Sequence, residues 1–80
     1  MATLRLFAAA REAAGTGQTR VEGSTVADVL AGAVASFGPG FQTVLQSCRV
    51  WVNGEQADPS TVVADSDEVA VLPPVSGGFE

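Results

Sequence analysis

The sequence predicts an α+β fold, a roll in which a mixed β-sheet packs on one main helix. Apolar residues recur at helical spacing in one long segment, 25–37, and alternate with polar residues at a period of two in segments before and after it. The predicted strands and helices do not alternate regularly along the 80 residues, which disfavours a doubly wound parallel sheet. We therefore expect one small domain built around a single sheet and a single main helix.

The residues before the main helix predict two strands joined by a short helix. Segment 3–7, Thr-Leu-Arg-Leu-Phe, alternates polar and apolar side chains as a half-buried strand does. The alanine-rich segment 8–14 has high helix propensity, and the glycine at position 15 stops it. Segment 18–22 predicts a second, weaker strand.

The main helix has a defined start and end. Thr25 and Asp28 match a capping box, in which each side chain satisfies a backbone N–H group at the start of the helix. Segment 38–40, Gly-Pro-Gly, ends the helix because proline cannot continue it. The apolar face consists of Val26, Val29, Leu30, Ala33, Val34 and Phe37. We expect Leu30 to be buried against the sheet.

A shorter helix and three strands are expected after the main helix. Segment 41–48 keeps the helical spacing, and from 49 to 52 the period changes to two. Asn53-Gly54 is typical of a type I′ hairpin turn, so 55–57 should be a short return strand. Segment 68–72 is rich in apolar residues, as in a strand near the centre of a sheet.

Composition limits the classes of partner. Four arginines, no lysine, no histidine and nine acidic residues give a net charge of −5, which disfavours nucleic acid and anionic membranes and favours a partner with a basic surface. A single cysteine cannot form an internal disulfide, and no apolar run is long enough to cross a membrane. We therefore expect a cytoplasmic protein that binds neither nucleic acid nor membranes.

Few side chains are candidates for chemistry. Cys48 lacks a histidine to activate it as a nucleophile or sulfur relay, and its apolar register favours a buried structural thiol. Asp65, Asp67 and Glu68 could form half of a cation loop, but ordinary turn capping is the better interpretation. We expect no metal site, no bound cofactor and no catalysis by this chain alone.

The chain ends in a stiff stem and a diglycine: Pro73, Pro74, Val75, Ser76, Gly77, Gly78, Phe79 and Glu80. Proline cannot continue a strand ladder, and glycine has no Cβ, so such an arm could pass through a narrow channel. We interpret the chain as a domain at 1–75 and a flexible tail at 76–80, whose working group is the Gly78 carboxyl once Phe79 and Glu80 are removed. The alternative is an ordinary frayed terminus.

Three segments resemble one known family. They are Leu-Arg-Leu-Phe-Ala-Ala-Ala-Arg-Glu-Ala-Ala-Gly at 4–15, Val-Asn-Gly-Glu at 52–55, and Asp-Glu-Val-Ala-Val-Leu-Pro-Pro-Val-Ser-Gly-Gly at 67–78. Together they are similar to the MoaD/ThiS family of ubiquitin-like sulfur carriers, and most similar to its MoaD branch, the small subunits of molybdopterin synthase. The resemblance implies a ubiquitin-like β-grasp fold.

The resemblance also implies a reaction cycle at Gly78. In this family an E1-like adenylyltransferase uses ATP to convert the terminal glycine to an acyl adenylate, and a persulfide donor then leaves a thiocarboxylate. Pro73, Pro74 and Val75 would seat against the partner, while Ser76 and Gly77 would enter its active site with Gly78. A larger MoaE-like synthase subunit, or another sulfur-accepting synthase, would then receive sulfur for molybdopterin or a related product.

Phe79 and Glu80 lie beyond the family's terminal glycine. The resemblance to trimmed precursors implies that a JAMM-type zinc peptidase cuts between Gly78 and Phe79. Two alternatives remain: a ubiquitin-like modifier joined through Gly78 to lysines of other proteins, and a β-grasp interaction domain that never carries sulfur.

We also expect a docking surface on the domain. Outward-facing sheet residues and Val75 should form an exposed apolar patch. Acidic side chains are expected at its rim, where they would steer association more than they strengthen it.

Overall fold

The computed structural model describes residues 1–73 of the chain. The strands are β1 (Ala2–Leu6), β2 (Gln18–Val21), β3 (Arg49–Val52), β4 (Glu55–Gln56) and β5 (Glu68–Leu72), and the helices are α1 (Ala8–Ala14), α2 (Val26–Phe37) and α3 (Pro39–Leu45). The strands form one sheet in the order β2-β1-β5-β3-β4. β1 and β5 are parallel and the other neighbours are antiparallel, so the predicted mixed sheet is confirmed.

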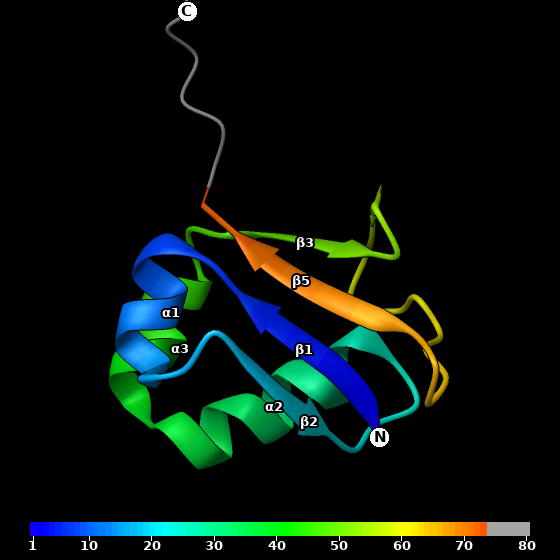
Figure 1. Cartoon of the computed structure of the whole chain (residues 1–80), viewed down its shortest axis with the longest axis horizontal. Coiled ribbons are helices and arrows are strands. Elements are labelled where there is room, and N and C mark those ends of the chain that lie inside the picture. Colours follow the sequence, from blue (N-terminus) through cyan, green and yellow to red (C-terminus); the bar gives the residue numbers. More distant parts are fainter. Residues whose placement is uncertain (74–80) are drawn as a thin grey trace, which may run out of the picture.

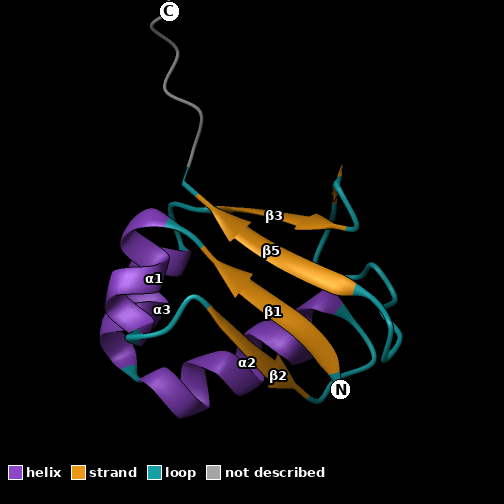
Figure 2. Cartoon of the chain, in the orientation of Figure 1, coloured by secondary structure: helices purple, strands orange, loops and turns teal. Residues whose placement is uncertain are grey.

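The helices leave one face of the sheet open. α2 crosses one face, and α1 and α3 pack together at the end of the sheet (Figures 1 and 2). β5 lies in the middle, between β1 and β3, as its apolar sequence predicts. No helix within residues 1–73 is long and apolar enough to cross a membrane.

The core lies between the inner face of the sheet and the helices. Its buried members are Ala2, Leu4, Leu6, Ala10, Val26, Val29, Ala33, Phe41, Val63, Val69 and Val71. Strand register brings these side chains together, because Leu4 pairs with Val69 and Leu6 with Val71 across the two central strands. Each fully buried side chain of this size contributes about 1.5–3 kcal/mol relative to an exposed one. The two central strands are therefore the best-supported part of the sheet.

The start of α2 differs slightly from an ideal capping box. The Thr25 hydroxyl accepts a hydrogen bond from the Asp28 N–H at 3.2 Å, as predicted. The Asp28 carboxylate, however, accepts from the N–H of Ser24, one residue before the cap, also at 3.2 Å. Both side chains still satisfy backbone donors that the helix itself leaves free.

The helix expected at 41–48 begins two residues earlier, at Pro39, and ends at Leu45. Gly38 ends α2, and Pro39 then occupies the first turn of α3, where its fixed φ suits a helix and its missing N–H costs nothing. The short connection brings the Phe37 and Phe41 rings into edge-to-face contact, with centroids 5.2 Å apart. Gly38 thus ends one helix, and Pro39 starts the next.

Leu30 was predicted to be buried against the sheet, and this prediction is wrong because its side chain is only partly buried. Val26, Val29 and Ala33 fill that position, while Leu30 is half-buried at the edge of the core. Leu30 lines a groove of about 290 Å³ together with Leu45 and residues of the β3–β4 region. A helical face about 100° wide includes flanking positions, and Leu30 is one of them.

Candidate functional site

The tail leaves the domain from its central strand. β5 ends at Leu72, and Pro73 follows directly as an exposed residue (Figure 1). Both neighbours hold the end of β5: Phe7 donates its N–H to the Val71 carbonyl at 3.2 Å, and Arg49 pairs with Leu72. Since proline has no N–H, the ladder stops there. The root of the tail is therefore fixed by strands on both sides.

Of the predicted tail residues, the structure places only Pro73. The others, which lie outside the described residues, are Pro74, Val75, Ser76, Gly77, Gly78, Phe79 and Glu80. The division at 75 and the proposed cleavage between Gly78 and Phe79 fall there as well.

A shallow groove on the open sheet face reaches the root of the tail. We call it the tail-root groove; it measures about 400 Å³ and is lined by Phe7, Arg49, Trp51, Gly54, Glu68, Ala70, Leu72 and Pro73. The register explains this gathering: Trp51 lies opposite Ala70, and Arg49 lies opposite Leu72, so their side chains share the outer face. Apolar surface thus continues from the middle of the sheet to the residue where the tail begins.

Phe7 lines one side of the tail-root groove, and Arg5 lies next to Phe7 outside the lining. The Phe7 side chain is 38% exposed, and the Arg5 guanidinium carbon lies 5.8 Å from its ring centroid. Arg5 also forms an ion pair with Glu68, at 3.4 Å between Nη1 and Oε2. Both partners are largely exposed, so the pair contributes at most about 1 kcal/mol. Arg5 is already engaged by neighbours within the domain.

The described lining of the groove contains one base, Arg49, and one acid, Glu68, while Val75 of the expected patch lies outside the described residues. Among residues 1–73, the ion pairs within 4.0 Å are those of Arg5 with Glu68 and of the N-terminal amine with Asp65, so Arg49 has no carboxylate partner there. Arg49 is exposed, and among residues 1–73 the one acid that lines the groove, Glu68, is paired with Arg5. The rim of the tail-root groove is therefore basic where it meets the tail.

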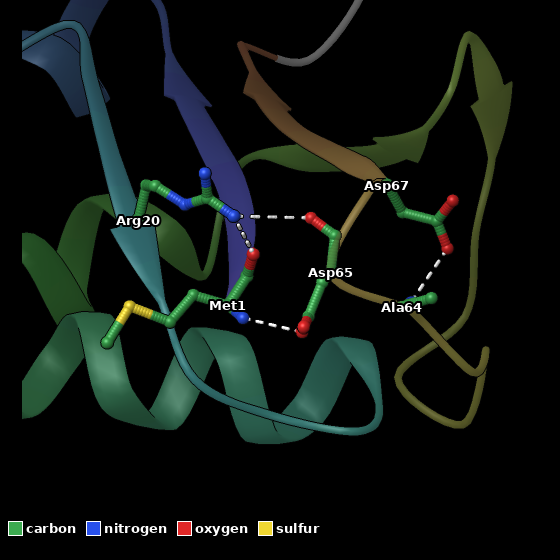
Figure 3. Close-up of polar contacts among 5 residues, drawn as sticks. All are labelled: Met1, Arg20, Ala64, Asp65 and Asp67. Atoms are coloured by element: carbon green, nitrogen blue, oxygen red, sulfur yellow. Dashed lines mark hydrogen bonds and ion pairs between the residues drawn. The ribbon is translucent and has the colours of Figure 1, made fainter.

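The turn before β5 confirms the capping interpretation for Asp67, whereas the carboxylates of Asp65 and Glu68 form ion pairs. Asp67 accepts hydrogen bonds from the Ala64 N–H at 2.8 Å and from the Asn53 side-chain amide at 2.9 Å (Figure 3 draws the first). The bond from Ala64, and after it the bond from Asn53, lowers the pKa of the Asp67 carboxyl. Both bonds are made to the ionised form.

Asp65 holds the start of the chain. Its carboxylate pairs with the Met1 amine, and this hydrogen bond lowers the pKa of Asp65. Arg20 donates to the carbonyl oxygens of Met1 and Asp65, as Figure 3 shows. Within the described part of the chain, no group of three or more His, Cys, Asp or Glu side chains is arranged to hold a metal ion.

Cys48 behaves as a structural thiol, although it is half-buried and not fully buried as expected. Its Sγ donates to the Val44 carbonyl at 3.3 Å, and burial raises the pKa of the thiol. A raised pKa keeps the group protonated, which disfavours nucleophilic or sulfur-relay chemistry. It lines the groove with Leu30 and does not line the tail-root groove, although its neighbour Arg49 lines both.

The sequence did not reveal that the aromatic and basic residues of the groove belong to one site. The signal was present in the alternation, because Arg5 lies between buried Leu4 and Leu6 and Phe7 follows Leu6, so both side chains should face outward. The sequence does not give the order of the strands, and this order is what places Trp51 beside β5.

A mixed five-stranded sheet rolled on one helix, with the chain end leaving from the central strand, defines the ubiquitin-like β-grasp class. The small archaeal modifier protein 1 of Methanosarcina acetivorans has this fold with a TM-score of 0.86, at 33% identity over 96% of this chain and 95% of that one. The ThiS family model matches residues 4–78, and the chain belongs to this family.

One curated relative and one solved structure of the same fold carry names linked to molybdopterin. A Chlamydomonas reinhardtii protein named molybdopterin synthase sulfur carrier subunit is 38% identical, over 90% of this chain and 92% of its own length. The complex of subunits 1 and 2 of molybdopterin-converting factor from Helicobacter pylori contains a chain of the same fold, with a TM-score of 0.69 at 22% identity over 96% of this chain and 97% of that one. The expected family and the expected β-grasp fold are confirmed.

Proposed function

We propose that this protein is a sulfur carrier whose Gly78 carboxyl group, after removal of Phe79 and Glu80, becomes a thiocarboxylate that donates sulfur in molybdopterin or related biosynthesis. One observation carries the proposal: the match to the ThiS family runs from residue 4 to residue 78 and stops at the second glycine. The name of the Chlamydomonas reinhardtii relative, a sulfur carrier subunit, supports the same role.

The chemistry requires a free carboxyl group at Gly78. A JAMM-type peptidase would hydrolyse the bond between Gly78 and Phe79, and an E1-like adenylyltransferase would join the carboxylate to AMP from ATP with release of pyrophosphate. The donor's persulfide then displaces AMP to form an acyl disulfide, and a thiol reduces this S–S bond to leave a thiocarboxylate on Gly78. A carboxylate is inert toward sulfur, whereas the mixed anhydride with AMP has a good leaving group, so activation is necessary. This chain supplies the carbonyl and its partners supply the catalytic groups.

The domain's part in this cycle is to present the tail. Five residues follow Pro73 up to Gly78, so the reacting carbonyl lies at most about 18 Å from the fixed root of the tail. A partner that seats on the open sheet face would therefore receive Gly78 at a limited depth. Errors of about 1 Å in the position of a reacting group cost on the order of a hundredfold in rate. A rigid root limits such errors in the position of the Gly78 carbonyl.

The proposed partners are the adenylyltransferase and a larger MoaE-like synthase subunit. The Helicobacter pylori complex supports a two-subunit arrangement only through its common fold with this chain. We place the cycle in the cytoplasm, where ATP is available.

A second function is supported by one observation. The Methanosarcina acetivorans relative is named a modifier protein, so Gly78 could instead be joined to lysines of other proteins. Digestion of proteins from the native host would distinguish the two, because a modifier leaves its C-terminal residues linked to lysine side chains. A carrier leaves none.

ATP–pyrophosphate exchange with the adenylyltransferase of the same host tests the proposal. A chain ending at Gly78 should support exchange, and the 80-residue chain should not, because its Gly78 carbonyl is part of a peptide bond. Gly78→Val in the shortened chain should abolish or sharply slow exchange, since a β-branched side chain widens the arm and restricts its φ.

A matched control keeps the exchange result specific. Val62→Ala changes an apolar side chain that is 75% exposed and lies outside the tail-root groove, so exchange should be unchanged. Equal exchange by the full-length and shortened chains would contradict the precursor argument. Absence of exchange by both would favour the interaction-domain alternative.

A further inference from the structure

The arginines of this acidic chain gather on the open face of the sheet. Three of the four lie there by strand register: Arg20 opposite Thr3, Arg5 beside Ala70, and Arg49 opposite Leu72. The net charge of −5 therefore does not describe this face. The partner chemistry expected from composition, a basic surface, does not fit the surface next to the tail.

Two of the three arginines are already engaged within the domain. Arg20 donates to the carbonyl oxygens of Met1 and Asp65, and Arg5 pairs with Glu68 and lies over the Phe7 ring. Arg49 has neither a carboxylate within 4.0 Å nor a side-chain hydrogen bond to another residue of the described chain. It stands beside Leu72, one residue before the tail begins.

We propose that the tail-root groove binds a segment of the adenylyltransferase that presents an apolar side chain with a carboxylate next to it. The apolar side chain would lie over Trp51, Ala70 and Leu72, and the carboxylate would pair with Arg49. This inference rests on the proposed function, since it names the surface chemistry of the partner that receives the tail.

The composition of the groove favours this occupant. Its lining combines two aromatic side chains, aliphatic side chains and one uncommitted guanidinium group. Trp and Arg are enriched among the interface residues that contribute most to the free energy of binding. A guanidinium group binds a carboxylate through two parallel hydrogen bonds, and exclusion of water by the surrounding apolar atoms strengthens such a pair. A purely apolar segment would leave Arg49 unpaired, and a basic one would repel it.

The chain's own C-terminus is the competing occupant. Glu80 carries two carboxylates in the 80-residue protein, and the seven residues after Pro73 can span up to about 25 Å. This length is sufficient to reach Arg49, so the test must separate the untrimmed terminus from the partner segment. The two occupants predict different behaviour for chains that end at Gly78 and at Glu80.

The test uses exchange by the chain ending at Gly78 with the adenylyltransferase of the same host. Arg49→Gln should raise the half-saturating concentration of the carrier about tenfold and leave the maximal exchange rate unchanged, because the contact positions the carrier and takes no part in the chemistry. Trp51→Ala should act in the same direction. Arg20→Gln is the matched control: it removes the same charge from the same face, outside the groove, and should leave both values unchanged.

Salt dependence gives a second readout. Added salt should raise the half-saturating concentration of the unchanged chain more steeply than that of Arg49→Gln, because one screened ion pair is missing from the variant. Equal urea midpoints for the three variants and the unchanged chain would show that folding is not the cause.

Each result decides between the proposals. Exchange with an unaltered half-saturating concentration for Arg49→Gln would overturn this inference and leave the sulfur-carrier function standing. No exchange by any chain ending at Gly78 would contradict the proposed function itself. In NMR spectra, the Trp51 indole resonance should be the same in the 78- and 80-residue chains; a difference that disappears in Arg49→Gln would assign the groove to the chain's own terminus instead.

Discussion

Asn53 joins the β3–β4 hairpin to the start of β5 through both ends of its side-chain amide. Its Nδ2 donates to Asp67 Oδ1 and its Oδ1 accepts the N–H of Glu68, each at 2.9 Å. Its backbone has φ of 51°, and Gly54 follows at 86°, as a type I′ turn requires. The predicted turn is confirmed, and the Asn53 side chain also links this turn to the start of β5 through two hydrogen bonds.

Substitution of Asn53 should separate these two contributions. Asn53→Gly keeps the left-handed backbone and loses both hydrogen bonds, whereas Asn53→Ala also places a Cβ in a conformation that costs about 1–2 kcal/mol. We expect both variants to be destabilised, and alanine by about 1 kcal/mol more than glycine, in urea unfolding followed by circular dichroism. Equal stability of the two variants would mean that the turn relaxes to another type.

The carboxyl of Asp67 should make the domain sensitive to acid. Hydrogen bonds from Ala64 and Asn53 lower its pKa in the folded state, so the stability it provides is present above the unfolded pKa, near about 4, and is lost as pH falls through the folded value. An NMR titration should show Asp67 protonating below the ordinary range. Asn53→Ala should raise this pKa only partly, because the Ala64 bond remains.

The Asp65 carboxyl provides the control for this titration, because its pKa is lowered by the N-terminal amine and not by Asn53. Its titration should be unaffected by Asn53→Ala. If Asp67 titrates in the ordinary range in the unchanged protein, the hydrogen bonds in the turn before β5 do not form in solution.

At the scale of elements, a leucine-to-alanine substitution in β1 and another in α2 compare the sheet side and the helix side of the core. Leu4 of β1 is fully buried, whereas Leu30 of α2 is half-buried beside a groove. Leu4→Ala should cost about 2–5 kcal/mol from lost burial and a cavity, and Leu30→Ala should cost clearly less, because water already reaches its position. Denaturant midpoints of the two variants give the comparison. A larger loss of stability for Leu30→Ala than for Leu4→Ala would contradict this assignment of the core.

Periodicity predicted the kinds of elements, because each depends on contacts a few residues apart. Segment 25–37 repeats at helical spacing over a full helix, and its predicted extent was correct to one residue. Pro39 was interpreted only as a stop, since local rules allow proline both to end one helix and to begin another.

The candidate site could be predicted only in part. The tail residues from Pro73 to Gly78 carry their signal in sequence, because prolines and glycines act through their own backbones. The tail-root groove depends on pairings between β3 and β5, about twenty residues apart, and no local pattern gives such pairings. This is why net charge suggested a basic partner while the groove favours an acidic one.

At the scale of the whole molecule, the sheet connects core, groove and tail. The central strand β5 contributes Val69 and Val71 to the core on one face and Ala70 and Leu72 to the groove on the other. It then leads directly into Pro73. The domain can therefore dock and present its terminus through a single rigid element, with no catalytic side chain of its own required.

The central claim is that Gly78 carries sulfur after the chain is trimmed. Intact mass spectrometry of the protein purified from its native host tests it most directly, and prompt analysis matters because a thiocarboxylate hydrolyses. We predict a species that lacks Phe79 and Glu80 and in which one oxygen of the terminal carboxyl is replaced by sulfur. A population that consists only of the intact 80-residue chain, under conditions in which the host makes the sulfur-containing product, would contradict the account.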